Sequence, residues 1–507
     1  MTPRAPGSYL LTGPVDWQEL TTGLTDLRLE QDPGEEPTSF RLLDSHDQSL
    51  RAKGAVLLEY DDRMHLLQAG GESLSQPSGP GHFPGELPEG PVRAVTEALF
   101  PLRCFLTLVE GRMCRRSLRV VDDEGKTQLR LEEIGLETAA GRLSLVTLRP
   151  LRGYDRAPAL IASALAAAGA GPLSGAAVLT TLAPDLVPYV AKPDIAIAGG
   201  DSAFDVAVRT ISAYLAVARA NEPGVIEDLD SEFLHDYRVA LRKIRSALSL
   251  FKEVFGQVQT EEMKVAFSAL MAPTGRLRDL DVYLMEREAY MSRVPEALRP
   301  GLDVMFDAFA KERRSAHAAL AKHLKSRAYQ GRISALVTGF DHPEGFVRGE
   351  AGTEAASGLA RRLIWKRYRK ICKIAAGIGA DTPDDEVHEL RIACKKFRYL
   401  IEFFAPLFPA KSVRKLIKAM KALQDNLGNF NDYSVQQAAL GSLVASGRLP
   451  TGPRGLEAAQ SIGALIAVLH QEQIRERARV METFAAFDSA STRALVARLC
   501  QHREARA

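Results

Sequence analysis

Two hydrophobic patterns divide the chain of 507 residues. Up to about residue 155, short apolar or β-branched runs are separated by Gly or Asp pairs, which is typical of strands joined by turns. From residue 202 onward, apolar residues recur with the period of long amphipathic helices. The pattern predicts an α+β N-terminal domain, built on an antiparallel sheet, followed by an all-α domain.

The N-terminal elements are expected to be short strands, one Ala-rich helix and one loop rich in Gly, Pro and Ser. The strand segments are 51–64, 104–110, 117–122, 127–133 and 142–148; the helix is 159–168 and the loop 69–91. Four prolines within 169–200 indicate a connection that can hold a short helix. We therefore expect a strand-rich domain at 1–170, a linker at 171–200 and a helical domain at 201–507.

The helical part contains one motif twice, 153 positions apart. The sequence HDYRVALRKIR begins at His235, and HELRIACKKFR begins at His388. A second pair of blocks, GRLRD at Gly275 and GNFND at Gly428, has the same offset. One offset in two blocks predicts a duplicated unit, with two pseudo-symmetric helical bundles at 202–340 and 355–505.

Each copy of the motif carries basic side chains on one helix face. At about 100° per residue, the His and three basic residues of each copy form a strip beside an apolar stripe. A solvated helix face usually mixes Glu with Lys, yet no acidic residue occurs from 239 to 252 or from 390 to 401. A plain solvated face is the alternative, but two self-repelling strips favour a long anion in a groove shared by the two bundles.

Charge and cysteine content narrow the possible functions. Residues 1–195 carry 19 Lys and Arg against 26 Asp and Glu, whereas the remainder carries 46 against 37. This asymmetry points to a polyanionic partner for the second half. Five cysteines without C-x-x-C spacing support neither a disulfide framework nor a structural zinc site. Without an apolar signal core or a span of 18 apolar residues, we expect a cytoplasmic protein with no membrane partner.

With these residues in view, positions 195–505 resemble the conserved-histidine α-helical domain family, called CHAD. The resemblance implies that inorganic polyphosphate binds in a basic groove between two four-helix halves, and association with polyphosphate granules is left open. It implies a groove lined by His235, Arg238, Arg242, Arg245, His388, Arg391, Lys395 and Arg398. Further candidates in the two blocks and motifs are Lys243, Arg276, Arg278 and Lys396.

The N-terminal part resembles a degenerate CYTH domain, an antiparallel β barrel or triphosphate tunnel. Residues 42–54, with Asp44 and Asp47, resemble that family's strand-turn segment, and 150–156 resemble its closing segment. The family's E-x-E-x-K motif, whose carboxylates hold metal and whose Lys meets phosphate, is absent from the first 40 residues. We therefore predict no catalytic residues, no metal site and no cofactor in this chain.

Several roles remain open for individual residues. His235 and His388 are candidates for core histidines or for phosphate contact; metal ligation is disfavoured because neither has a His or carboxylate at i+4. Asp279 and Asp432 are expected to be buried partners that hold basic side chains, with Asn431 in the same supporting group. Lys366, Arg367, Arg369, Lys370 and Lys373 extend the groove or form a solvated face.

Three functions are weighed against one another. Binding of polyphosphate without catalysis is the leading hypothesis. Hydrolysis of triphosphate or polyphosphate by the N-terminal domain is the second, and nucleic-acid binding by the same groove is the third. Stacking aromatics are absent from the cationic strips, which disfavours nucleic acid. The sequence leaves the oligomeric state open.

Overall fold

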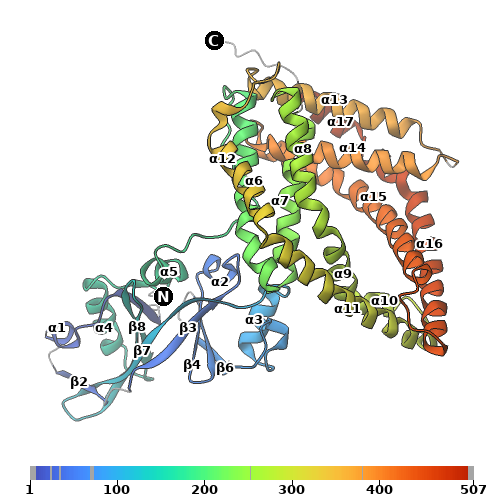
Figure 1. Cartoon of the computed structure of the whole chain (residues 1–507). Helices are drawn as coiled ribbons and strands as arrows, with labels where there is room; N and C mark the ends of the chain where they lie inside the picture. The colour runs from blue at the N-terminus through green and yellow to red at the C-terminus, as the bar shows by residue number, and fades with distance from the viewer. Residues whose placement is uncertain are drawn as a thin grey trace. The chain divides into compact units, whose positions relative to one another are not determined.

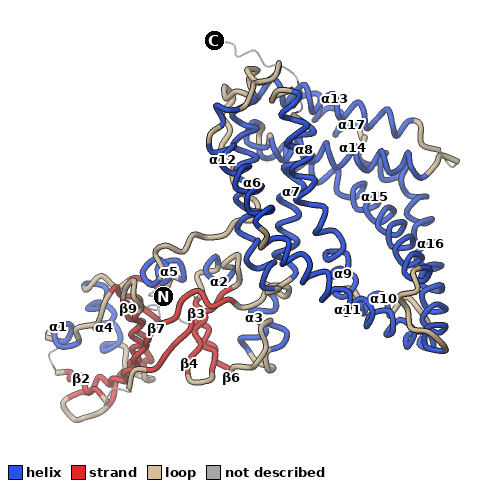
Figure 2. Tube along the Cα trace, viewed as in Figure 1, coloured by secondary structure: helices blue, strands red, loops and turns tan. Residues whose placement is uncertain are grey.

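The computed structural model describes residues 7–22, 26–32, 36–68, 73–251, 253–379 and 381–500. The chain divides into two compact units, Met1–Val190 and Ala191–Ala507. We call the first the sheet unit, since its strands form one sheet, and the second the helical unit (Figures 1 and 2). The predicted order, α+β followed by all-α, is confirmed.

The sheet unit is built on one antiparallel sheet. Its strands are β1 Ser8–Thr12, β2 Leu27–Gln31, β3 Thr38–Asp44, β4 Val56–Tyr60, β5 Arg63–Leu67, β6 Ser73–Pro77, β7 Leu106–Asp122, β8 Thr127–Glu137, β9 Arg142–Pro150 and β10 Gly171–Pro172. The hydrogen-bonded order is β10-β1-β9-β8-β7-β3-β4-β5-β6, and β2 also pairs with β7. Its helices are α1 Trp17–Thr21, α2 Ser49–Ala52, η1 Pro84–Glu86, α3 Pro91–Leu99, α4 Arg156–Ala167 and α5 Gly175–Leu182.

Four of the expected N-terminal elements differ from the structure. Segment 51–64 is not one strand, because Asp61 and Asp62 have φ values of 51° and 55° and turn the chain between β4 and β5. Segments 104–110 and 117–122 belong to the single strand β7. The loop expected at 69–91 contains β6 and η1, while residues 69–72 lie outside the described residues.

Apolar side chains cover both faces of the sheet. On one face Phe40, Leu58 and Leu136 belong to a buried cluster completed by α5. The opposite face packs against α1 and α4 in one cluster, and against α2 and α3 in another. Burial of apolar side chains against helices on both faces stabilises the unit and fills the space beside the sheet.

Helix α5 lies within the stretch expected to be mainly a connection. Ser174 accepts a hydrogen bond from the backbone N–H of Ala177 at 3.4 Å and so caps the helix. Val178, Leu179 and Leu182 of α5 are buried in the sheet cluster. The two compact units meet in sequence after this helix, between Val190 and Ala191.

The helical unit contains long amphipathic helices. They are α6 Ala203–Glu227, α7 Ser231–Leu250, α8 Gln257–Met271, η2 Ala272–Thr274, α9 Gly275–Met285, α10 Arg287–Met291, η3 Glu296–Leu298, α11 Arg299–Leu324, α12 Arg327–Asp341, η4 Pro343–Gly345, α13 Ala356–Ala376, α14 Asp384–Phe403, η5 Ala405–Leu407, α15 Ala410–Ala445, α16 Pro453–Phe487 and α17 Ala490–Cys500.

The sequence repeat is also visible in the helix boundaries. Helices α6, α7 and α8 begin at 203, 231 and 257, and helices α13, α14 and α15 begin 153 residues later, at 356, 384 and 410. Helices α7 and α14 have the same length of 20 residues. The copies differ where Pro273 interrupts the first half between α8 and α9, whereas α15 continues without a break.

Two apolar contacts join the halves of the helical unit. At one end, Tyr290 and Phe306 of the first half pack in one buried cluster with Leu440 and Leu465 of the second. At the other, Phe251 after α7 packs on the rings of Phe403 and Phe404, with ring centroids 6.0 Å and 5.3 Å apart. Figure 1 shows α15 and α16 running alongside each other within this unit. The joined cores fix α7 and α14, the two helices with basic motifs, relative to each other.

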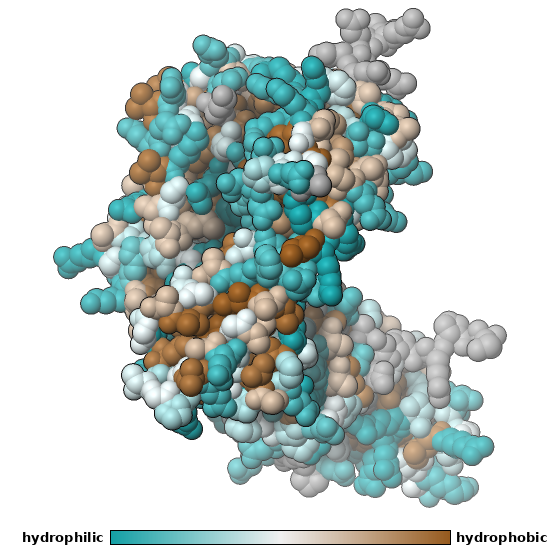
Figure 3. Space-filling view, turned by 90° about the vertical axis from the view of Figure 1, so that its right-hand side faces the viewer, coloured by the Kyte–Doolittle hydropathy of each residue, from teal (hydrophilic) through white to brown (hydrophobic). Residues whose placement is uncertain are grey.

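The surface mixes polar and apolar residues. In Figure 3, hydrophobic side chains on the visible face gather in areas that hydrophilic ones interrupt. Among the described residues, no helix is both long and apolar enough to span a membrane.

Candidate anion-binding site

Helix α7 carries the first basic motif. Its N-cap is Asp230, whose carboxylate accepts hydrogen bonds from the N–H groups of Glu232 and Phe233 at 2.9 Å and 3.2 Å. The apolar stripe expected from the sequence is buried, with Tyr237 and Leu241 fully inaccessible to solvent. This packing leaves the neighbouring face, which bears the basic residues, outside the core.

Helix α14 carries the second motif in the same manner. Three acidic residues stand in its first turn, where negative charge favours a helix N-terminus. Leu390 and Phe397 are buried, whereas His388, Lys395 and Arg398 are exposed. The helix thus presents cations beside a fully packed stripe.

The two basic helices bring three cations together. Burial is the largest cause, and the charges of Arg391 and Arg242 the next, that together lower the pKa of the Lys395 ammonium to about 8 against the opposing charge of Asp432. Burial likewise lowers the pKa of Arg391, with Arg242 again contributing. Lys395 reaches solvent, but neighbouring protein replaces part of its water shell. We call Arg242, Arg391 and Lys395 the central cluster; it joins one residue of α7 to two of α14.

The second sequence blocks lie against the first ones. The guanidinium of Arg278 on α9 is 3.0 Å from Nδ1 of His235. A guanidinium only donates, so Nδ1 accepts, which places the proton of a neutral His235 on Nε2. Arg238 donates to the hydroxyl of Thr274 at 2.5 Å. Arg278 of the GRLRD block therefore orients the histidine, and Thr274, directly before the block, orients the first arginine of the motif.

The carboxylates of the two blocks occupy corresponding places. Asp432 lies 3.6 Å from Arg391, and Asp279 is the carboxylate whose charge raises the pKa of Arg238 against the effect of burial. These pairs are related by the same 153-residue offset as the motifs. Asn431 donates to Asp432 at 3.2 Å. The expectation of buried carboxylates is wrong, since both Asp279 and Asp432 are exposed.

The two histidines have different surroundings. His235 contacts Arg278, but the corresponding residue of the second copy is Asn431. The side chain of His388 is exposed and makes no hydrogen bond with the described residues. The duplication kept the cation–carboxylate pairs and changed the partner of the histidine.

Other candidate cations are held by carboxylates outside the central cluster. Arg276 donates twice to Glu312 of α11, both at 2.6 Å, and Arg448 contacts the same carboxylate at 3.0 Å. Lys243 pairs with Glu402 and stands over the ring of Tyr399, 4.4 Å from its centroid. These contacts stabilise packing between helices and leave less positive charge for a ligand.

The remaining two arginines and Lys396 lie at the margins. Arg398 donates to Glu402 at 2.7 Å and to Gln424 at 3.1 Å. Arg245 is exposed, with Nη1 3.5 Å from the sulfur of Met271. Burial lowers the pKa of Lys396, and the charges that add to this effect belong to Arg367, Lys370 and Lys264. Lys396 therefore belongs to a different group of cations from its neighbour Lys395.

Sequence reasoning missed the partners that orient the cations. Thr274 directly precedes the GRLRD block, and its hydroxyl accepts from Arg238 while donating to the carbonyl of Met271 at 2.6 Å. Glu402 lies one turn beyond the second motif and binds both Lys243 and Arg398. An acidic residue at i+4 from Arg398 was the available signal for the second of these contacts.

Asp44 of the sheet unit lies in the segment that resembles the CYTH strand-turn. Asp44 is buried, and its carboxylate accepts from the N–H groups of Ser45, Leu50 and Arg51 at 2.8 to 3.0 Å. It holds the turn into α2. Within the described ranges, no group of three or more His, Cys, Asp or Glu residues is placed to hold a metal ion.

Comparison with known protein families gives a match within the helical unit. Residues 209–441 match the family model of the CHAD domain. The sheet unit, an antiparallel sheet with apolar faces, is compatible with a CYTH-like fold. No curated protein matches the chain.

Two solved structures are similar to the chain. The crystal structure of the CHAD domain from the plant Ricinus communis has 26% identity, covering 58% of this chain and 95% of that one, with a TM-score of 0.49. The structure of PptA from Streptomyces chartreusis has 14% identity, covering 56% and 99%, with a TM-score of 0.44.

Proposed function

We propose that the helical unit binds inorganic polyphosphate in a groove between α7 and α14, with the central cluster at its middle. The observation that carries this proposal is the approach of Arg242, Arg391 and Lys395; burial, and after it the charges of the two arginines, lower the pKa of Lys395. Like charges brought together at a surface cost free energy unless an anion neutralises them. A chain of phosphates supplies that charge at every unit.

The cluster is suited to a flexible polyanion. Arginine forks donate two parallel hydrogen bonds to phosphate oxygens, and lysine adds a movable point charge. Asp432 beside Arg391 and Thr274 beside Arg238 hold the forks in place before a ligand arrives. Release of counterions from the polyanion then drives binding and makes it sensitive to salt.

Nucleic acid is the weaker candidate for the same groove. Binding of single strands normally relies on aromatic rings that stack with bases. The rings within the two motifs, Tyr237 and Phe397, are fully buried, and Tyr237 forms a hydrogen bond of 3.0 Å with Tyr329. A site that contacts only backbone charge favours an anion without bases.

We infer that the protein binds polyphosphate without hydrolysing it. The cluster that α5 completes on one face of the sheet is apolar, and Asp44 is committed to backbone hydrogen bonds. Association with polyphosphate granules in the cytoplasm follows from this role as part of the same proposal. Imaging of the tagged protein against a granule stain tests that part separately.

Direct binding measurements test the proposed function. The full chain is titrated with long polyphosphate and with single-stranded DNA and RNA of equal charge, across a salt series. Polyphosphate should bind more tightly than either nucleic acid at every salt concentration. Equal affinity for DNA or RNA near physiological salt would contradict the proposal.

A further inference from the structure

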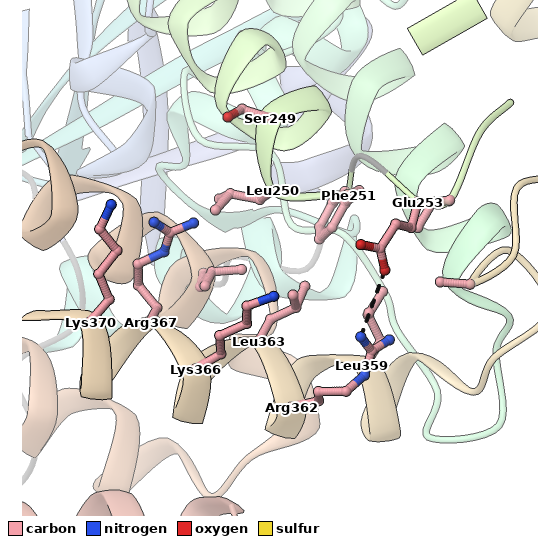
Figure 4. Close-up of a pocket in the computed structure, with 13 residues that line it drawn as sticks. Ser249, Leu250, Phe251, Glu253, Leu359, Arg362, Leu363, Lys366, Arg367 and Lys370 are labelled. Atoms are coloured by element: carbon pink, nitrogen blue, oxygen red, sulfur yellow. Dashed lines mark ion pairs between the residues drawn. The ribbon is translucent and has the colours of Figure 1, made fainter. Parts of the chain in front are cut away.

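A pocket of about 170 Å³ lies where the C-terminal end of α7 approaches α13. Its wall includes the apolar side chains of Leu250, Leu359 and Leu400. Figure 4 shows Lys366, Arg367 and Lys370 rising from α13 toward the end of α7, where Ser249 and Leu250 lie. The pocket thus combines an apolar wall with a row of cations.

One end of the pocket is closed by an ion pair. Arg362 lies 3.8 Å from Glu253, the contact drawn as a dashed line in Figure 4, and also pairs with Glu354. Lys370 contacts Glu389 at 2.8 Å outside the pocket lining. Arg362 and Lys370 are therefore partly neutralised by carboxylates.

Arg367, which lines the pocket, and Lys396, which lies on α14 one turn before the lining residue Leu400, have no such partner among the described residues. Arg367 is half-buried, and no carboxylate among the described residues lies within 4.0 Å of its guanidinium. Lys396 of α14 is also half-buried, and its charged neighbours in the described part of the chain are Arg367, Lys370 and Lys264. Charges that lose water without gaining a counter-ion are costly. An anion placed between them would remove this cost.

This group is separate from the central cluster. The adjacent residues Lys395 and Lys396 have different charged neighbours. Arg391 and Arg242 act on Lys395, whereas Arg367 and Lys370 act on Lys396. Successive residues on a helix differ by about 100° in direction, so one helix can serve two sites. Helix α14 therefore contributes a cation to each of two anion-attracting places.

We propose that the pocket between α7 and α13 is a second anion site, which binds one phosphate group through Arg367 and Lys396. Its small volume suits one phosphate group and its waters. The Glu253 carboxylate at the closed end repels a continuing chain, so the site suits a terminal phosphate, which carries up to two charges. The apolar wall strengthens the attraction by lowering the local dielectric constant.

The proposal takes its ligand class from the proposed function, and the phosphate can come from the end of a long chain or from a short free oligophosphate. Titration of the full chain with inorganic tripolyphosphate and with long polyphosphate distinguishes these sources. The parent should bind two tripolyphosphate ions. In the variant Arg367→Met with Lys396→Met, which keeps the aliphatic bulk, the affinity of one of these two sites for tripolyphosphate should fall at least tenfold.

Matched variants distinguish a failure of this pocket proposal from a failure of the proposed groove. Arg369→Met with Lys373→Met alters two exposed cations of α13 that do not line this pocket, and should bind like the parent. Arg242→Gln with Lys395→Met should remove the other tripolyphosphate site. If that variant binds normally while the pocket variant fails, the proposed groove is wrong and the pocket stands. If the pocket variant binds two ions like the parent, the pocket proposal is overturned.

The single substitution Lys396→Met tests the site in a protein that should still fold. Lys396→Met should not lower the unfolding temperature of the ligand-free protein, because it removes repulsion from Arg367 and Lys370. The same variant should show a smaller rise in unfolding temperature on addition of tripolyphosphate. A rise equal to that of the parent would overturn the proposal.

Discussion

Neutralising Arg242 and Lys395 together should weaken polyphosphate binding far more than neutralising two equally exposed cations elsewhere. The two side chains come from different helices, and the charge of Arg242 contributes to the lowered pKa of Lys395. Both lie outside the buried stripes of α7 and α14. Arg242→Gln with Lys395→Met therefore removes charge and leaves the core intact.

The expected loss follows from the type of contact. A hydrogen bond between ionised groups contributes on the order of 1 to 3 kcal/mol. Two such contacts give about 2 to 6 kcal/mol, a loss of roughly 30-fold or more in affinity. If each cation releases about 0.7 counterions, as for single-stranded nucleic acids, the slope of log affinity against log salt should fall by about 1.4.

The assay is a titration with long polyphosphate at several salt concentrations. The control is Arg454→Gln with Arg475→Gln, two exposed residues of α16. Arg477 is unsuitable as a control, because it donates to the carbonyls of Gly379 and Thr382 at 2.9 Å and 3.0 Å. If both double variants lose affinity equally, binding is diffuse electrostatics and the central cluster is not a site.

Three further predictions concern pH, packing and catalysis. The pKa of Lys395 in the folded protein, about 8, lies below its ordinary value of 10.5, so between these values the unfolded chain holds more protons. The free energy of unfolding should therefore rise with pH in that window. Binding of polyphosphate near pH 9 should take up a proton, which calorimetry in two buffers would measure. Both effects should be smaller in Lys395→Met. Arg276→Gln should lower the free energy of unfolding by about 1 kcal/mol, because Glu312 loses a bidentate partner. The affinity for polyphosphate should not change. If chemical unfolding shows unchanged stability while this affinity falls, Arg276 belongs to the groove. The full chain should release no phosphate from tripolyphosphate or ATP with magnesium or manganese; turnover that scales with protein concentration and disappears when the sheet unit is removed would refute this.

The helical half was predictable because its signals are local and repeated. Each motif has one strip of cations beside one apolar stripe, and helical periodicity alone separates the two. The single offset of 153 residues anticipated the matching starts of α7 and α14. The break at Pro273 also has a sequence cause, since proline interrupts a helix.

The strand-rich half was less predictable because packing outweighs local signals. Strand segments were expected at 104–110 and 117–122, yet Gly111, which follows the first of them, lies within the single strand β7. A Cβ at this position would meet the carbonyl oxygen of Glu137 at 2.2 Å and the ring of Phe40 at 2.8 Å. The glycine allows close approach between neighbours rather than a turn.

Which cations are paired with carboxylates could be learned only from the three-dimensional structure. Helical periodicity places Lys243 near the basic face but cannot show that Glu402 of α14 meets it. Likewise, adjacent residues Lys395 and Lys396 look equivalent in sequence and face different neighbours in the structure. Which cation stays available to a ligand depends on the helix packed beside it.

A structure of the full chain bound to polyphosphate tests the central claim most directly. The account predicts a row of phosphates between α7 and α14, with phosphate oxygens within hydrogen-bond distance of Arg242, Arg391 and Lys395. Phosphates bound only on outer surfaces, with these three side chains left in solvent, would contradict it.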